Sequence, residues 1–390
     1  MRACVSRKRA MSTYVPEELL VKILSLQPPK SLIRFRSVCK TWDSLIGNPD
    51  FFSKNLLNHS IIISPENTDD HRFLVVDGRD KFNGGARQVC SILYYDTLEG
   101  EGVSPQTPLC LPDYNLFCIH CDKIVASFDG FLCLSCHACY DNIVIWNPYT
   151  KYVFKGPWNF SDCKSPTGSI INEENVGFGL DLKSNDLKVV RIRTYLRMPG
   201  KGKAVQDVQL YSVNRGSWTE LCVDLPYGFL DRKRFTFYID GVFYWYAPSD
   251  CDVVLKNEIV AFDMSEETFS MTKVPDKCCV ESNNYWRWTT LTELKKRVAM
   301  IRYTSESSNI TFNLWVLLEF GVMESWTKLF TIIPASPLGR PLGLWKNGKF
   351  FLTDTMGHLV LWDPFTGEIK KLNVAEQTIV SLSIHSMWKR

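Results

Sequence analysis

Residues 15–52 read VPEELLVKILSLQPPKSLIRFRSVCKTWDSLIGNPDFF, and this stretch decides the fold at the start of the chain. Apolar residues recur at helical spacing before the Pro28–Pro29 pair, and a second apolar stripe runs from Leu32 to Ile46. A proline pushes the preceding residue out of the α region, so we expect a first helix to end at this pair. About forty residues cannot bury a self-sufficient core. Because the stretch is apolar on two sides, we expect another protein to cover the second side.

The same stretch resembles an F-box. Val15–Leu19 corresponds to the opening LPxEL of that motif, Pro29–Leu32 to its middle, and Val38–Ile46 to its closing VCKxWxxLI. The stretch departs from the motif at Val15 and Gln27, where leucine is usual, and both positions lie near expected helix ends. The resemblance implies docking onto a Skp-type adaptor of a cullin-based ubiquitin ligase. An amphipathic helical cap on the next domain is the alternative.

The resemblance also indicates which residues dock onto the adaptor. Ten residues are assigned to this contact: Pro16, Leu19, Ile23, Leu26, Pro28, Leu32, Val38, Cys39, Trp42 and Leu45. Some of them must instead pack the interior of the helical unit, and the sequence does not separate the two groups.

The composition is that of a folded chain rich in β-structure. Hydrophobic residues make up 45% of the 390 and charged residues 22%, as in ordinary globular proteins. Aromatic residues reach 13%, with 12 tryptophans, and large rings favour pleated faces. The formal net charge of +3 gives no argument for nucleic acid or an acidic membrane as a partner. The length suits one small and one large domain, or two to three domains of ordinary size.

We expect the protein in the cytoplasm, the nucleus or both. The sequence contains no run of about eighteen apolar residues that would predict a membrane span. Its first ten residues carry charge without the apolar core of a signal peptide, and residues 1–11 are expected to form a disordered tail. In a reducing compartment the 14 cysteines are expected to be buried thiols.

From about Ile61 onward, short apolar runs separated by turn residues replace the helical spacing and predict antiparallel strands. Five of these runs carry an aromatic residue before a turn and a returning strand. These anchor residues are Trp146, Tyr211, Phe262, Trp315 and Trp362, at spacings of about 47 to 65 residues, a period typical of kelch-like propeller blades.

A second hairpin precedes several anchors. Asp129–Gly130, Asp240–Gly241 and Asn347–Gly348 supply the positive φ that a type I′ turn requires. Two hairpins per period make a four-stranded blade, and we predict a β-propeller of about six blades. The last strand-like run, residues 378–385, has no partner after it, so we expect it to return and complete the first blade. An open pair of packed sheets is the alternative.

This second region resembles the F-box-associated interaction domain that is common in plant F-box proteins, including S-locus F-box-like proteins. Matching pieces include Gly177–Asp181, Gly241–Trp245 and Asn347–Lys349, and together such pieces cover most of residues 60–385. The chain departs from the family at Asp129, where asparagine is usual after a cysteine, here Phe128. The resemblance implies a mainly β fold: a helical F-box at residues 12–58, then a client-binding propeller at residues 60–390.

Together the two resemblances imply the substrate-recognition subunit of an SCF-type (Skp–cullin–F-box) ubiquitin ligase. The expected partners are a Skp-family adaptor, a cullin reached through it, and a protein client destined for ubiquitination and proteasomal degradation. The client and its contact residues stay unspecified. Holding a client near a conjugating enzyme needs no acid or base, so we expect no enzymatic activity and no cofactor in this chain. A glycan-binding or scaffold propeller tagged with an F-box is the alternative.

Cysteine spacing suggests one site of another class. Cys118 and Cys121, with Cys133 and Cys136, form two CxxC units similar to zinc sites. Alternation along a strand would send Cys133 and Cys136 to opposite faces, which is poor geometry for joint ligation. We therefore expect no metal.

Basic and aromatic clusters offer weaker candidates for a client surface. We expect three basic runs to lie at turns or strand edges with solvated side chains, and a rim for an acidic client is the alternative. The runs are Arg191, Arg193 and Arg197 with Lys201 and Lys203, then residues 232–234, and residues 295–297. Trp286 and Trp288 suit either a client contact or core packing.

Overall fold

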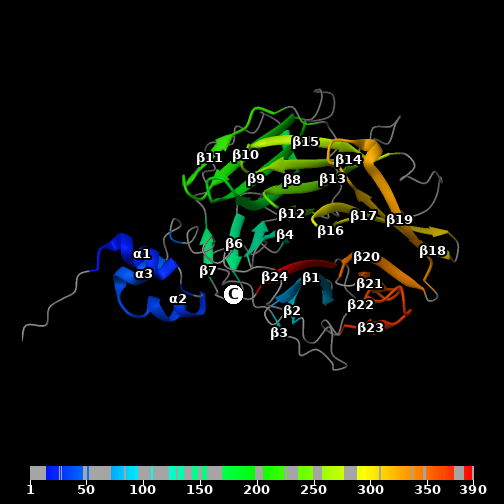
Figure 1. Ribbon diagram of the computed structural model, residues 1–390, viewed down its shortest axis with the longest axis horizontal. Helices are drawn as coiled ribbons and strands as arrows, with labels where there is room; N and C mark the ends of the chain where they lie inside the picture. Colours follow the sequence, from blue (N-terminus) through cyan, green and yellow to red (C-terminus); the bar gives the residue numbers. More distant parts are fainter. Residues whose placement is uncertain are drawn as a thin grey trace, which may run out of the picture. The chain divides into compact units, whose positions relative to one another are not determined.

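The computed structural model divides the chain into two compact units, Met1–Pro65 and Glu66–Arg390 (Figure 1). None of the helices that it describes is long and apolar enough to cross a membrane. The described residues are 15–46 without 26 and 28, 51, 72–82, 85–94, 107–108, 123–128, 131–135, 143–147, 152–155, 169–197, 205–223, 225, 236–248, 257–275, 288–306, 309–334, 337–345, 348–372 and 382–388.

The first unit consists of short helices: α1 (Glu17–Ser25), α2 (Pro29–Arg36) and α3 (Lys40–Ile46). As predicted, α1 ends before the proline pair. Pro29 begins α2, where its missing N–H costs no helical hydrogen bond. The apolar stripe from Leu32 to Ile46 is divided between two helices, because a turn with a hydrogen bond from Val38 N to Phe35 O ends α2.

These helices close on a small apolar core. Phe35 and Trp42 pack edge to face beside it, with their ring centroids 5.5 Å apart. Burying one large apolar side chain contributes about 1.5–3 kcal/mol, so a core of this size leaves the unit only marginally stable. The buried members are Leu24, Leu32, Leu45, Ile46 and Phe51.

The second unit is built from strands. Among the described residues they form six four-stranded antiparallel sheets, and five of these sheets use four consecutive strands. The sixth has the order β24-β1-β2-β3. The strands are β1 (Arg72–Phe82), β2 (Gly85–Tyr94), β3 (Thr107–Pro108), β4 (Lys123–Phe128), β5 (Phe131–Ser135), β6 (Ile143–Asn147), β7 (Tyr152–Lys155), β8 (Ser169–Asp181), β9 (Asp186–Arg197), β10 (Val205–Ser212), β11 (Ser217–Glu220), β12 (Thr236–Ile239), β13 (Val242–Pro248), β14 (Asn257–Asp263), β15 (Thr268–Lys273), β16 (Trp288–Leu294), β17 (Arg297–Glu306), β18 (Asn309–Leu317), β19 (Trp326–Ile332), β20 (Leu338–Leu344), β21 (Phe350–Asp354), β22 (Leu359–Trp362), β23 (Ile369–Lys371) and β24 (Leu382–Trp388).

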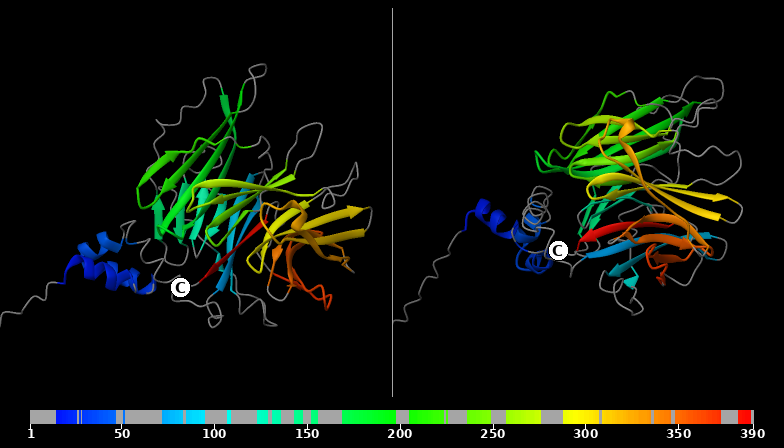
Figure 2. Two further views of the ribbon diagram at one scale, coloured as in Figure 1. Left: turned by 45° about the horizontal axis from the view of Figure 1, so that its top comes forward. Right: turned by 45° about the vertical axis from the view of Figure 1, so that its right-hand side comes forward.

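The leading strands of neighbouring sheets contact one another around a closed ring: β24, β4, β8, β12, β16, β20 and back to β24 (Figure 2). A closed ring of such sheets is a β-propeller. The predicted return of the C-terminal strand is confirmed, because β24 pairs antiparallel with β1 and places His385 opposite Val75. The described strand covers Leu382–Trp388, and residues 378–381 of the expected run lie outside the described residues. The alternative of an open pair of sheets is therefore wrong.

The aromatic residues that mark the repeat occupy one structural position. Each lies on the third strand of its sheet, and all are buried. The ring of Trp362 on β22, for example, packs against Phe312 of the preceding blade, with centroids 5.8 Å apart. The five are Trp146 on β6, Tyr211 on β10, Phe262 on β14, Trp315 on β18 and Trp362 on β22.

The type I′ turn expected at Asp240–Gly241 is also present. The two residues have φ of 44° and 95°, and they join β12 to β13. Gly348 has φ of 77°, whereas Asp129–Gly130 and Asn347 lie outside the described residues.

Candidate protein-binding surfaces

The helical unit leaves large apolar side chains in solvent. Leu19 and Ile23, four residues apart on α1, are each 52% exposed, and Val38 after α2 is 60% exposed. Residues four apart lie on one face of a helix. Leu24, next to Ile23 in sequence, is 1% exposed and lies in the core. The unit is therefore apolar on two sides, as predicted, and one of these sides is uncovered within the unit.

The ten predicted docking residues fall into different environments. Leu32 and Leu45 lie in the core of the helical unit, and Trp42 is half-buried against Phe35. Leu26 and Pro28 lie outside the described residues. The remaining five are exposed: Pro16, Leu19, Ile23, Val38 and Cys39.

Sequence reasoning missed Val15, which is 46% exposed beside Pro16. The signal was present, because Val15 is an apolar residue directly before the first helix and outside its periodic stripe. An ion pair from Arg36 Nε to Asp43 Oδ1, at 2.6 Å, links α2 to α3 at the surface. Such an exposed pair contributes little stability, about 0–1 kcal/mol.

The centre of the propeller is packed with aromatic rings at one level. Phe128 of β4 contacts Tyr238 of β12 and Phe178 of β8, with ring centroids 4.6 Å and 6.3 Å apart. The Tyr238 hydroxyl donates a hydrogen bond to Leu180 O at 2.7 Å. Burial raises the pKa of this phenol, so it stays a neutral donor. At this level the inner strands β4, β8 and β12 are held together by side-chain packing.

The expectation that Arg191 and Arg193 are solvated at a strand edge is wrong. Both are buried on β9, between two blades. Arg193 Nε donates to Glu174 Oε1 at 3.2 Å, and Ser135 Oγ of the preceding blade donates to the other oxygen of the same carboxylate at 2.9 Å. Arg193 is therefore linked to the preceding blade through Glu174, whereas Arg191 contacts Gln209 and Trp218 of its own blade. Neither buried side chain forms a rim for an acidic partner.

The other basic and aromatic candidates give less information. Lys295 and Lys296 form the expected turn between β16 and β17, and Lys296 Nζ pairs with exposed Asp240 Oδ2 at 3.1 Å. Residues 232–234 and Trp286 lie outside the described residues, as does the side chain of Trp288 at the start of β16.

A buried lysine joins the same blade to the next one. Lys188 Nζ on β9 donates to Asp181 Oδ2 and to Glu267 Oε1, both at 2.8 Å, and the side chains of Lys188 and Asp181 are each 4% exposed. Burial alone would raise the pKa of the Asp181 carboxyl. Hydrogen bonds from Lys188, Ser184 and Ser265 outweigh this effect and hold the pKa well below its ordinary value. The network therefore fixes the turn after β14 against the end of β8.

Cys133 does not support the zinc alternative. Its side chain is completely buried, and burial, together with the negative charge of Glu174, raises the pKa of its thiol. A raised pKa disfavours the thiolate that binds metal. Within the described ranges, no group of three or more His, Cys, Asp or Glu residues could hold a metal ion. Cys118, Cys121 and Cys136 lie outside those ranges.

Comparison with known proteins accounts for both units. Residues 15–54 match the F-box domain, and residues 104–385 match the F-box associated beta propeller domain. The chain belongs to the F-box proteins that carry this propeller. It is 25% identical over 359 residues to the F-box/kelch-repeat protein At3g23880 of Arabidopsis thaliana. The aligned region covers 90% of this chain and 88% of that protein. F-box protein CPR1 of the same plant is 23% identical over 380 residues, covering 92% and 83%.

In this F-box protein, the uncovered apolar face lies inside the matched F-box residues. Val15, Leu19, Ile23 and Val38 all fall within residues 15–54. Proteins with an F-box are typically non-catalytic subunits of ubiquitin ligases, and a face that recruits another protein is consistent with such a role. The F-box-associated propeller supplies a second, larger body with surfaces of its own.

Proposed function

We propose that this F-box protein is the client-recognition subunit of an SCF-type ubiquitin ligase in the cytoplasm, the nucleus or both. The observation that carries the proposal is the uncovered apolar face of the helical unit. Four of the fourteen large apolar side chains that are exposed in the described residues lie on this small unit: Val15, Leu19, Ile23 and Val38. Apolar surface of this kind marks a site that another protein covers.

The proposed partner of this face is a Skp-type adaptor, which links the chain to a cullin. Leu19 and Ile23 provide adjacent anchors on α1, and Val38 provides a third from the turn after α2. Pro16, Val15 and Cys39 border them. Leu32 and Leu45 contribute indirectly, because they hold the helices that present the anchors. Truncation of a central anchor in such an interface costs about 2 kcal/mol or more, or roughly thirtyfold in affinity.

The propeller, residues 60–390 in this proposal, binds a protein client for ubiquitination and proteasomal degradation. The chain acts by position: bringing a client lysine close to a charged conjugating enzyme raises its effective concentration. The inter-blade hydrogen bonds from Lys188 to Glu267 and from Ser135 to Glu174 support this role, because a rigid ring holds its surface loops in place.

The test is co-purification of the full-length chain with a Skp-type adaptor, followed by reconstituted ubiquitin transfer with cullin and conjugating enzyme. Leu19→Asp with Ile23→Asp should abolish adaptor binding and leave circular dichroism unchanged. Phe365→Asp, at an exposed phenylalanine of the propeller, is the matched control and should bind normally. Wild-type adaptor binding by the double variant would show that the face is wrong. Adaptor binding without chain-dependent ubiquitin transfer would instead support the scaffold alternative.

A further inference from the structure

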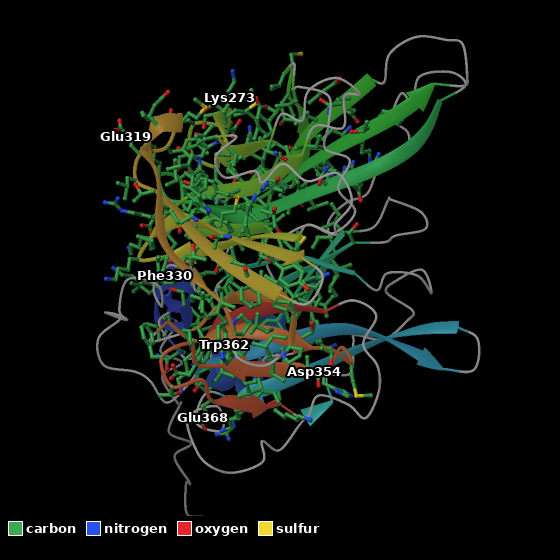
Figure 3. The ribbon with its side chains drawn as sticks, turned by 90° about the vertical axis from the view of Figure 1, so that its right-hand side faces the viewer. Lys273, Glu319, Phe330, Asp354, Trp362 and Glu368 are labelled. Carbon is green, nitrogen blue, oxygen red and sulfur yellow. The ribbon has the colours of Figure 1, made fainter. Side chains whose placement is uncertain are left out.

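One face of the β16–β19 blade carries a row of polar side chains that crosses all of its strands. Arg302 of β17 is opposite Thr289 of β16 and Asn313 of β18, and Asn313 is in turn opposite Thr331 of β19. Residues directly opposite each other in an antiparallel sheet lie on the same face. We call these residues the polar row. In Figure 3, the label of Phe330, the residue before Thr331, marks the outer end of the row on β19.

The polar row faces the neighbouring β12–β15 blade. Arg302 Nη2 donates to the Tyr246 hydroxyl of β13 at 3.3 Å, and this hydroxyl donates to Asn257 Oδ1 of β14 at 2.6 Å. Two residues along each strand, the same face becomes apolar. Met300 and Trp315 lie there and belong to a core cluster that includes side chains of β14. The row therefore lies between two blades, at the border of an apolar core.

Arg302 differs from the other buried cations of the propeller. Among the residues that the structure describes, four cationic side chains are buried. Three have a carboxylate partner, because Lys188 pairs with Asp181 and the two buried arginines of β9 pair with Glu174. Arg302, 7% exposed, has no carboxylate partner in the described ranges, and its Nε has no hydrogen-bond partner there. A buried charge without a counter-charge is costly, so Arg302 favours an anion beside it.

The rest of the row adds hydrogen-bond donors and a second cation. Asn313 Oδ1 accepts a hydrogen bond from Thr331 Oγ1 at 2.7 Å, so the Nδ2 group of Asn313 remains a donor. Lys328 Nζ, on the exposed outer strand, donates to Thr331 Oγ1 at 3.2 Å and lies 5.5 Å from the centroid of the Trp315 ring. The row thus combines positive charge with N–H donors, and none of its own members is acidic.

We propose that the polar row is a carboxylate-binding site anchored by Arg302, and that an acidic side chain or the C-terminus of a protein client supplies the carboxylate. A guanidinium presents parallel N–H donors that match the two oxygens of a carboxylate. Arg302 Nε is one donor of this fork. The buried part of the row holds a single positive charge, which a carboxylate neutralises, whereas a phosphate would bring about −1.5 to −2 charges. The assignment of the bound protein as a ligase client rests on the proposed function.

The first experiment selects short random peptides on the purified full-length chain from two displayed libraries. In one library both peptide ends are fused, so only side chains supply carboxylates, and in the other the C-terminus is free. We expect enriched peptides to lose about tenfold or more in affinity when their carboxylate is replaced by the amide. Arg302→Met should bind the two forms equally. Arg297→Met, at an exposed position of the same strand, is the matched control and should keep the wild-type preference.

Thermal unfolding of free variants gives an independent measurement. Arg302→Met removes a buried charge that has no counter-charge, so we expect an unfolding temperature equal to or above that of the wild type. Arg193→Met removes a buried cation that lies 3.2 Å from Glu174 Oε1, and it should lower the unfolding temperature by several degrees. An arginine that only joined blades would give a similar loss at both positions.

Three results would overturn the proposal. These are libraries without enrichment, peptide binding that does not depend on both the carboxylate and Arg302, and an Arg302→Met variant that unfolds as early as Arg193→Met. The last would mean that a carboxylate of this chain already pairs with Arg302. Adaptor binding, measured on the same samples, separates the two proposals: an adaptor that fails to bind wild type refutes the ligase role and leaves the peptide result standing.

Discussion

Replacing Lys188 by methionine tests whether the buried ion network holds the propeller together. Lys188 Nζ lies 2.8 Å from Asp181 Oδ2 and from Glu267 Oε1, and the side chains of Lys188 and Asp181 are each 4% exposed. Methionine fills a similar volume but leaves a buried carboxylate without its cation. Removing one member of such a buried pair costs about 3–5 kcal/mol of the free energy of unfolding. We expect Lys188→Met to fall in this range.

Lys183→Met is the matched control. Lys183 is five residues away and also pairs with an acidic residue of the turn after β14, Glu266, but its side chain is 69% exposed. Urea unfolding of the full-length chain, followed by tryptophan fluorescence, should show a lower midpoint for Lys188→Met and no measurable change for Lys183→Met. The reasoning is refuted if the two variants unfold at the same urea concentration. A double variant, Lys188→Met with Asp181→Leu, should recover part of the loss, because neither charge is then left buried alone.

Three further predictions concern packing and pH. Gly177→Ala should cost about 1–3 kcal/mol in thermal unfolding, because its Cβ would lie 2.7 Å from Trp245 Cζ2, whereas Gly343→Ala, with no atom within 4 Å, should be nearly neutral. Leu24→Ala should cost the helical unit about 2–5 kcal/mol and lower the temperature at which its circular dichroism signal is lost; an unchanged temperature would contradict its place in the core. Because the pKa of Asp181 is depressed in the folded state, its carboxylate stabilises the fold above about pH 4, and this stabilisation is lost as the pH falls toward the folded-state pKa. In urea unfolding measured at a series of pH values, Asp181→Asn should therefore show a smaller decrease in the free energy of unfolding below about pH 4 than the wild type.

The repeat could be predicted from sequence because each blade uses the same chemistry at the same place. Trp146 and Trp362 both lie at or next to the end of the third strand of a sheet, and turn-forming residues follow each in the sequence, so the pattern recurs at a visible period. Asp240–Gly241 adds a turn whose conformation follows from the residue types. The pairing of β24 was predictable for a different reason. A last strand without a following partner leaves an unpaired edge, and pairing with β1 of the first blade removes that edge and closes the ring.

Contacts between blades could not be predicted in the same way. Arg193 and Lys188 occur in a strand whose local pattern resembles a solvated edge, and their partners come from residues distant in sequence. Glu174, for example, receives a hydrogen bond from Ser135, thirty-nine residues earlier. Nothing in the local sequence of β9 indicates that these charges are neutralised. A β-bulge at Leu329 of β19 was missed for a similar reason, because it is defined by register against β18.

In the helical unit, the sequence predicts two apolar sides but does not indicate which side is buried in the core and which is exposed. Ile23 and Leu24 are neighbours with nearly equal hydrophobicity, yet one is 52% exposed and the other 1%. The difference arises because α2 and α3 cover one side of α1, and the turn at Val38 that divides them is specified only weakly by sequence.

The two surfaces should therefore respond differently to substitution. In the helical unit, a small core lies directly beneath the exposed anchors, so binding of the adaptor adds stability by mass action and is coupled to folding. On the propeller, the core beneath the β18–β19 hairpin includes Trp315, Trp326 and Met300, and the exposed side chains of Leu329 and Phe330 lie outside it. Substitutions of these exposed propeller residues should leave stability nearly constant, whereas substitutions in the F-box core, such as Leu24→Ala, should lower stability and adaptor binding together. Measuring the affinity and the unfolding temperature of the same variants separates these two behaviours. An F-box whose stability does not rise when the adaptor is added would contradict the argument.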